Sequence, residues 1–252
     1  MKKICIDPGH GGTDSGAAAN GIREEDINLR VALAVRSGLQ AIGHTVAMTR
    51  TSDIDVGLTA RGRFSVAQKA DVFLSIHHDA GTNSARGCSA FYWSRNTPNG
   101  KDLATQVSEA VAAEWDLPFA YNGNSPDDNR RMPARVHWIS LGVLRGGDNW
   151  KHVTAALVEC CFLTNAKDSA NIKRDDYVPR TAAAIVRGIQ AHVASEWPDD
   201  DSLQTVPGAP VKGTTVKIID ASTEKVITEY EMAHNGDHIE DQGKLYVIGG
   251  SQ

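Results

Sequence analysis

The sequence has no long uninterrupted apolar run, and this absence excludes a helix that spans a membrane. No segment approaches the roughly 20 apolar residues that a transmembrane helix needs. The first apolar strand follows Met1 and two lysines directly, which leaves no room for a signal peptide. We therefore expect a protein that is made in a cytoplasm and reaches its place of action by a route other than secretion.

Cysteine is also scarce, which excludes a disulfide scaffold. The four cysteines are Cys5, Cys88, Cys160 and Cys161, and their spacing matches no zinc-finger pattern. Because Cys160 and Cys161 are adjacent, a relaxed disulfide between them is unfavourable. We interpret all four as reduced, small apolar residues.

An excess of positive charge is missing as well. The chain carries 26 Lys and Arg against 31 Asp and Glu, a net charge of −5. Nucleic-acid binding usually needs a basic face, so we expect no nucleic-acid partner. With 252 residues the chain can form one large domain and a small appendage. A body of nearly two hundred residues can bury roughly 70% of its unfolded surface without disulfides.

Short apolar runs alternate with amphipathic stretches through the first part of the chain, which predicts an α/β fold. We expect a mixed, largely parallel twisted sheet flanked by helices. The expected strands are 3–6, 45–49, 72–76, 88–93, 143–144 and 155–159. The expected helices are 25–41, 58–68, 101–114 and 175–197. The irregular stretch 116–138 is interpreted as a long loop, with a short helix within it as an alternative; long loops in compact domains are usually functional or disordered.

The composition changes after residue 197. Residues 198–213 are polar and carry prolines, which is typical of a linker. Residues 214–252 are interpreted as a small β-rich C-terminal module, with a hairpin over 214–219 and 225–232 and a third strand over 244–248. Some forty residues is near the limit for independent folding. The sequence thus predicts a main domain over 1–197 and a tail that packs on that domain, on another copy or on a surface ligand.

Four residues with metal or proton chemistry stand at the ends of these elements. His10 follows the first strand in a Gly-rich turn, Glu24 opens the first long helix, His77 ends the third strand, and Glu159 closes a later one. Two histidines and a glutamate are a common catalytic zinc set that leaves a fourth position for water. A further glutamate can take a proton from that water and pass it to a leaving amine.

At these residues the chain resembles the zinc-dependent N-acetylmuramoyl-L-alanine amidases of the type-3 family. The matching motifs occur in order over roughly residues 3 to 195. They are Ile6–Gly12, Gly21–Leu29, Thr49–Asp53 with Leu58 and Arg61, Ala70-Asp71, Ser75–His77, and Leu157–Glu159 with Phe162–Asn165. The resemblance implies His10, Glu24 and His77 as ligands of one zinc ion and Glu159 as the catalytic acid and base. It also implies peptidoglycan as substrate, cut between N-acetylmuramic acid (MurNAc) and the L-Ala of the stem peptide.

Two of these residues have a neighbour that could take the same role. Glu25 competes with Glu24, since acidic residues in a first helical turn often only face the helix dipole. His78 competes with His77, but adjacent strand residues point to opposite faces, so one of the two should reach the metal. The family match favours Glu24 and His77. His78-Asp79 departs from the family, which usually has a small residue and Asn at these positions.

Cys160 and Cys161 also depart from the family, which more often has Thr or Val followed by Gly. They lie next to Glu159 and could be nucleophiles or ligands. No histidine base stands at a recognisable spacing, so a structural role is favoured. Arg50 and Arg61 match family positions and are interpreted as structural groups that bridge acids near the sheet.

Several tryptophans and histidines could have a binding role, judged by residue type alone. Three tryptophans could line a glycan groove, although packing is an equal reading: Trp93, Trp138 and Trp150. His234 and His238 could form a metal pair, but a solvated loop is the better interpretation.

The whole chain resembles a phage or prophage endolysin, made in the host cytoplasm and acting on the cell wall. The tail would then serve wall targeting, assembly or self-association. A sporulation or cell-separation amidase is the nearest alternative. A zinc peptidase acting on stem peptides is another, although the helical HExxH pattern is missing. A non-catalytic wall-binding module is the third, and the presence of all four site residues argues against it.

Overall fold

The fold is taken from a computed structural model of the chain. The described residues are 1–92, 99–118, 141–145 and 153–196, together with the backbone of five short strands. Those strands are β7 (Val136–Trp138), β9 (Thr215–Ile219), β10 (Val226–Glu231), β11 (Glu240–Asp241) and β12 (Lys244–Leu245). None of the helices in this part of the chain combines the length and the apolar character that crossing a bilayer requires.

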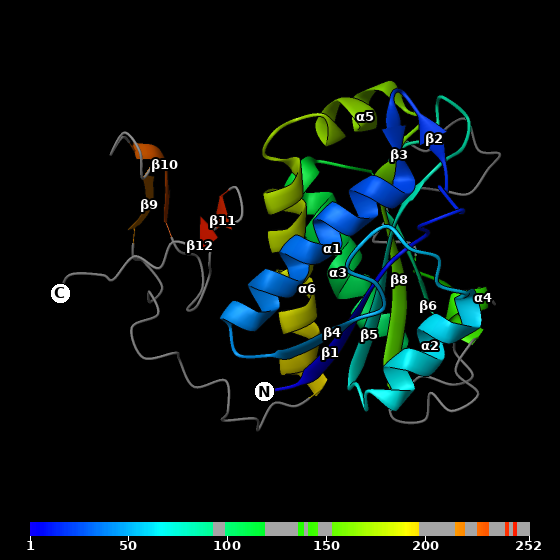
Figure 1. Cartoon of the computed structure of the whole chain (residues 1–252). Coiled ribbons are helices and arrows are strands. Elements are labelled where there is room, and N and C mark those ends of the chain that lie inside the picture. The colour runs from blue at the N-terminus through cyan, green and yellow to red at the C-terminus, as the bar shows by residue number, and fades with distance from the viewer. Residues whose placement is uncertain are drawn as a thin grey trace.

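One six-stranded sheet forms the centre of the molecule, in the order β4-β1-β5-β8-β6-β7 (Figure 1). Its other members are β1 (Lys3–Pro8), β4 (Thr45–Met48), β5 (Val72–Asp79), β6 (Ser89–Tyr92) and β8 (Thr154–Phe162). Neighbouring strands are parallel except for β6 and β8, which are antiparallel. The predicted mixed, largely parallel sheet is therefore confirmed.

Helices cover both faces of this sheet (Figure 1). On one face lie α1 (Glu24–Ala41), α3 (Gly100–Trp115) and α6 (Tyr177–Glu196). On the other lie α2 (Leu58–Ala67) and the short α4 (Gly142–Arg145). Because strand side chains alternate, Phe73 packs with the second group while its neighbours Val72 and Leu74 pack with the first. The central strands are thus buried on both faces, as parallel strands require.

One predicted strand is wrong. Val143 and Leu144 lie in the helix α4, not in a strand, and both are buried. Two apolar residues carry no periodicity, so the pattern could not separate a buried strand from a buried helical turn. Like the residues of a core strand, both belong to a buried apolar cluster, against which Phe64 of α2 packs.

Two small features were not predicted. A hairpin of β2 (Ala18–Ala19) and β3 (Ile22–Arg23) turns at Asn20 and Gly21, which both have positive φ. The helix α5 (Ala166–Ile172) begins after Asn165, whose side chain accepts hydrogen bonds from the backbone N–H groups of Lys167 and Asp168. The Asn-Gly pair and the capping Asn are standard signals for a turn and a helix start.

In the tail, β9 and β10 form an antiparallel pair where a hairpin was predicted. The strand β12 begins at Lys244, where the third strand was expected. The boundaries of the domain, linker and module stay predictions. The predicted loop over 116–138 is wrong at its end, because residues 136–138 form the strand β7 of the central sheet. The segment 119–135 lies outside the described residues.

Candidate active site

Two buried arginines hold the turn that carries His10. This residue follows β1 with φ +60°, a conformation that is unfavourable for a side chain with a Cβ. Arg61 donates to the carbonyl oxygens of Pro8 (2.6 Å) and His10 (2.8 Å), and Arg50 donates to those of Pro8 (3.1 Å) and Gly9 (2.9 Å). Charge-assisted bonds to three successive carbonyls keep this strained turn in place.

Within the described part of the chain, Arg61 bridges an acid as predicted and Arg50 does not. Arg61 forms a salt bridge of 2.9 Å with Asp7, which lies fully buried in β1. Asp7 also accepts hydrogen bonds from Thr49 and from Ser75 (2.6 Å), so its charge is compensated from three separate parts of the chain. The hydrogen bonds of Arg50 instead go to backbone carbonyl oxygens.

His10, Glu24 and His77 meet where β1, α1 and β5 end or begin. Glu24 Oε1 lies 3.1 Å from His10 Nε2 and 3.0 Å from His77 Nδ1. One nitrogen or oxygen atom of each residue lies within 4.8 Å of the others, a spacing at which the three could hold a metal ion. The second carboxylate oxygen of Glu24 accepts a hydrogen bond from the backbone N–H of Ala17 (2.9 Å), which fixes the rotation of the carboxylate.

The surroundings of Glu24 and of His10 favour the charged form of each side chain. Burial alone would raise the pKa of Glu24, but hydrogen bonds from His10 and His77 bring this pKa well below its usual value. Burial opposes a charge on His10, and its contacts with Glu24 and Asp14 more than offset this, so the pKa of His10 is raised. Glu24 is therefore an ionised carboxylate between two imidazoles. A positive charge beside it, on an imidazole or on a bound cation, balances its negative charge.

Gly9 allows His77 to approach the turn after β1. A Cβ on Gly9 would stand 2.2 Å from Cε1 of the His77 ring, a distance that no real contact reaches. The ring centroids of His10 and His77 are 4.9 Å apart. The glycine of the turn is therefore required for the meeting of the two histidines as well as for its bend.

Glu159 lies beside His77 on the neighbouring strand. The two residues are register partners in the parallel pair of β5 and β8, so their side chains leave the sheet on the same face. Glu159 Oε2 is buried and has no hydrogen-bond partner among the described residues. Burial, with repulsion from Asp79 and Glu24, raises the pKa of Glu159 well above its usual value. The strand continues to Phe162, so Glu159 does not close it as expected.

The structure separates both pairs of adjacent candidates. The His78 side chain is buried and hydrogen-bonded to Asn28 and Tyr177, outside the cluster that holds His77. Glu25 Oε1 lies 2.9 Å from Arg23 Nη1. Of each pair, the residue that the family match favoured is the one in the cluster.

Asp14 was not singled out from the sequence. Its Oδ2 lies 2.9 Å from His10 Nδ1, and its Oδ1 accepts a hydrogen bond from the backbone N–H of Gly16. A carboxylate on the second ring nitrogen is the usual outer partner of a metal-binding histidine. The spacing of four residues within the Gly-rich turn was the available signal.

Comparison with known proteins decides the family. The model of the family described as N-acetylmuramoyl-L-alanine amidase matches residues 4–191. The chain belongs to this amidase family. It is 32% identical over 187 residues to the N-acetylmuramoyl-L-alanine amidase LytC of Bacillus subtilis, a match that covers 73% of this chain and 34% of LytC. It is 29% identical over 219 residues to the endolysin of Bacillus phage SPP1, covering 86% of this chain and 76% of that protein.

Solved amidase structures share the fold. The N-acetylmuramoyl-L-alanine amidase from Clostridium difficile 630 has a TM-score of 0.66 and 28% identity, and the match covers 77% of this chain and 98% of that one. The catalytic domain of CwlV from Bacillus (Paenibacillus) polymyxa has a TM-score of 0.64 and the same identity. The chain therefore spans about a third of LytC but nearly all of these solved chains.

The cysteines that depart from the amidase family pattern are buried and free. Burial raises the pKa of Cys160 and of Cys161 well above the usual thiol value, which disfavours a nucleophilic thiolate. Cys161 lies within β8 and needs no special backbone conformation. The structural interpretation of both is supported. Trp93, Trp150, His234 and His238 lie outside the described residues, as does the side chain of Trp138.

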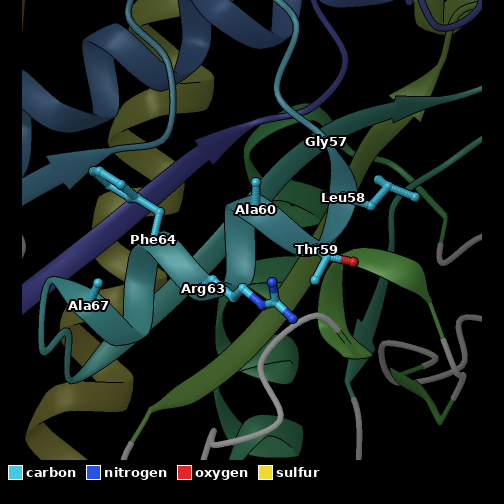
Figure 2. Close-up of a pocket in the computed structure, with 7 residues that line it drawn as sticks. All are labelled: Gly57, Leu58, Thr59, Ala60, Arg63, Phe64 and Ala67. Atoms are coloured by element: carbon cyan, nitrogen blue, oxygen red, sulfur yellow. The ribbon is translucent and has the colours of Figure 1, made fainter.

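A surface hollow of about 740 Å³ lies elsewhere on the amidase fold (Figure 2). Its lining comes from α2 and the residue before it: Gly57, Leu58, Thr59, Ala60, Arg63, Phe64 and Ala67. The helix α2 covers the sheet face opposite α1, and the hollow contains none of the four site residues. Volume alone therefore does not mark the chemistry of this molecule.

Proposed function

We propose that this protein is a peptidoglycan amidase that hydrolyses the amide bond between MurNAc and the L-Ala of the stem peptide. The observation that carries this proposal is the cluster of His10, Glu24 and His77 with Glu159 in register beside it. Membership of the amidase family supports the identity of the bond. The acidic chain and its lack of a basic excess agree with a substrate other than nucleic acid.

The cluster fits one zinc ion. Two imidazole nitrogens and a carboxylate oxygen are a donor set that zinc accepts, with a fourth position open. Zinc bonds of about 2.0–2.1 Å at tetrahedral angles put neighbouring ligand atoms about 3.3 Å apart. The contacts of Glu24 Oε1 with the two histidines, 3.1 and 3.0 Å, are close to that separation. A bound zinc ion would supply Lewis-acid chemistry, polarising a carbonyl and making a water more acidic.

Glu159 would move the proton. Its side chain is only partly buried, and Oε2 has no partner among the described residues, so the carboxylate would accept a proton from an attacking water. The same carboxyl would then protonate the departing amine of L-Ala, because hydrolysis of an amide needs a base first and an acid afterwards. The raised pKa of Glu159 has the direction that a group holding this proton between the two steps requires.

We further propose an endolysin-like role on the cell wall. The match with the SPP1 endolysin extends over 86% of this chain, compared with 73% for LytC. The tail at 214–252 would then bind the wall or join copies of the chain. Binding of the full chain and of a chain ending at residue 197 to purified walls tests this: only the full chain should be retained if the tail targets the wall.

Product analysis on purified peptidoglycan tests the activity. The proposal expects new amino groups of L-Ala without new reducing sugars. Amino groups from inside the stem peptide would instead identify a peptidase. Wall binding without any new product would identify a non-catalytic module.

A further inference from the structure

His78 lies next to a proposed zinc ligand but turns into the protein interior. Its side chain is 1% exposed and has a defined partner on each ring nitrogen. Nδ1 lies 2.8 Å from Oδ1 of Asn28 on α1, and Nε2 lies 2.8 Å from the hydroxyl of Tyr177 on α6. Both ring nitrogens therefore have the hydrogen-bond partners that a buried polar side chain requires, and the two partners come from two different helices.

The Asn28 amide fixes which nitrogen of His78 carries the proton. Its NH2 group faces two acceptors, Glu24 Oε1 at 3.2 Å and the carbonyl oxygen of Gly9 at 3.3 Å. The amide oxygen therefore faces His78, and only a proton on Nδ1 can complete that hydrogen bond. Because the ring is buried and both of its side-chain partners are uncharged, the neutral form is favoured, so His78 is protonated on Nδ1 with Nε2 left as an acceptor.

Tyr177 extends this chain of hydrogen bonds, with each group donating in the same direction. Its O–H donates to His78 Nε2, so its oxygen is free to accept from the thiol of Cys161, whose Sγ is 3.3 Å away. Donation runs without conflict from Cys161 through Tyr177, His78 and Asn28 to the carboxylate of Glu24.

We propose that His78 is a positioning residue, which holds the Asn28 amide so that its NH2 group orients the Glu24 carboxylate toward His10 and His77. This inference rests on the proposed zinc site and deepens it. Without the Nδ1–H donor, nothing in this contact opposes rotation of the amide, which would bring its oxygen against Glu24 and push the carboxylate away. The proposed role explains a buried histidine and tyrosine that the hydrolytic step itself does not use.

The ring tautomer is the first test, and it needs no substitution. Nitrogen-15 NMR of the metal-free protein at neutral pH distinguishes a protonated from a bare ring nitrogen. We expect His78 to be protonated on Nδ1 and bare on Nε2, the reverse of the form that neutral histidine prefers in water. A proton on Nε2 would overturn the proposal whether or not zinc binds.

Zinc affinity, measured by competition with a chelator, is the second test. His78→Leu removes the donor and should weaken zinc binding about 10-fold or more, in the range of outer-partner substitutions. His78→Asn places an amide N–H near the position of Nδ1 and should restore most of that affinity. His192→Leu is the matched control, since His192 is fully buried on α6 and its imidazole lies 2.7 Å from Asp102 of α3, a residue that is not part of the site.

The outcomes separate this inference from the proposed function. If His78→Leu folds and binds zinc as tightly as the unsubstituted protein, the positioning role is wrong and the zinc site stands. If His78→Leu and His192→Leu weaken binding equally, the effect is general destabilisation and the proposal is wrong. If the unsubstituted protein binds no zinc, the proposed function fails, while the NMR measurement of the His78 tautomer still tests the hydrogen-bond network.

A second variant serves if His78→Leu does not fold. Tyr177→Phe, which removes only a hydroxyl, should also weaken zinc binding, and unchanged binding would contradict the proposal.

Discussion

Glu24 and Glu25 are adjacent in the first turn of α1, yet their carboxylates have different partners. Glu24 Oε1 lies between His10 and His77, at 3.1 and 3.0 Å, whereas Glu25 Oε1 lies 2.9 Å from Arg23. We predict that Glu24→Gln loses stoichiometric zinc and that Glu25→Gln keeps it, because only the first substitution removes a charged donor from the cluster. Metal analysis after dialysis measures both, and the reverse pattern would show that the ligand is Glu25.

Asp14 should strengthen the metal site through His10. Its carboxylate contacts His10 Nδ1 at 2.9 Å and thereby favours the ring form with Nε2 free to bind. We predict that Asp14→Asn weakens zinc binding by about 10- to 100-fold. Asp26→Asn is the control, since Asp26 is an exposed carboxylate paired with Arg23 away from the cluster. Equal zinc affinity of the two variants would show that Asp14 has no such role.

Much of the fold could be predicted because its signals are local. The buried strand that begins at Val72 and the helix α1 have the apolar run and the helical spacing that define such elements. The helix over Val143 and Leu144 could not be predicted, since two apolar residues have no period. Their state depends on packing against α2, a contact that only the folded chain shows.

The residues of the candidate site could be predicted from the sequence, but the residues that hold them in place could not. Ordered motifs pointed to His10 and His77, and strand alternation indicated that His78 would face elsewhere. The partners of His78, in contrast, come from positions 28 and 177, which no local pattern links. The same applies to the hydrogen bonds of Arg50 to the turn before His10, which join residues about 40 positions apart.

Gly188 allows α6 to approach α3 closely. A Cβ there would stand 2.5 Å from the Cα of Val107, a backbone atom that cannot move aside alone. Alanine in a helix gains about 1 kcal/mol over glycine, but overpacking costs about 1–3 kcal/mol. We predict that Gly188→Ala lowers the free energy of unfolding by up to about 2 kcal/mol, measured by urea denaturation.

Gly38 provides the matched control for that substitution. Its nearest neighbour would be a terminal methyl of Val186 at 3.0 Å, which can shift by a small side-chain rotation. Gly38→Ala should therefore leave the free energy of unfolding unchanged or raise it by up to about 1 kcal/mol. If Gly188→Ala is as stable as Gly38→Ala, the two helices are not packed as closely as described.

The cysteines should be unreactive in the native protein. All four are buried, and burial raises the pKa of Cys5 to about 12 and those of the other three well above the usual thiol value. Thiolate is the reactive form, so its population at pH 8 is very small. We predict that iodoacetamide at pH 8 labels the denatured chain four times and leaves the native chain unlabelled, as mass spectrometry would show. Rapid labelling of native Cys160 or Cys161 would instead show that the thiol is reactive and would favour a chemical role for it.

The zinc-loaded Glu159→Gln variant tests the account most directly. Glutamine keeps the shape of the side chain beside His77 but cannot take up the proton of an attacking water. We predict stoichiometric zinc with release of L-Ala amino groups from purified peptidoglycan slowed by about 10²- to 10⁴-fold, the usual contribution of a general acid and base. Full hydrolysis by a zinc-loaded Glu159→Gln protein would contradict the account.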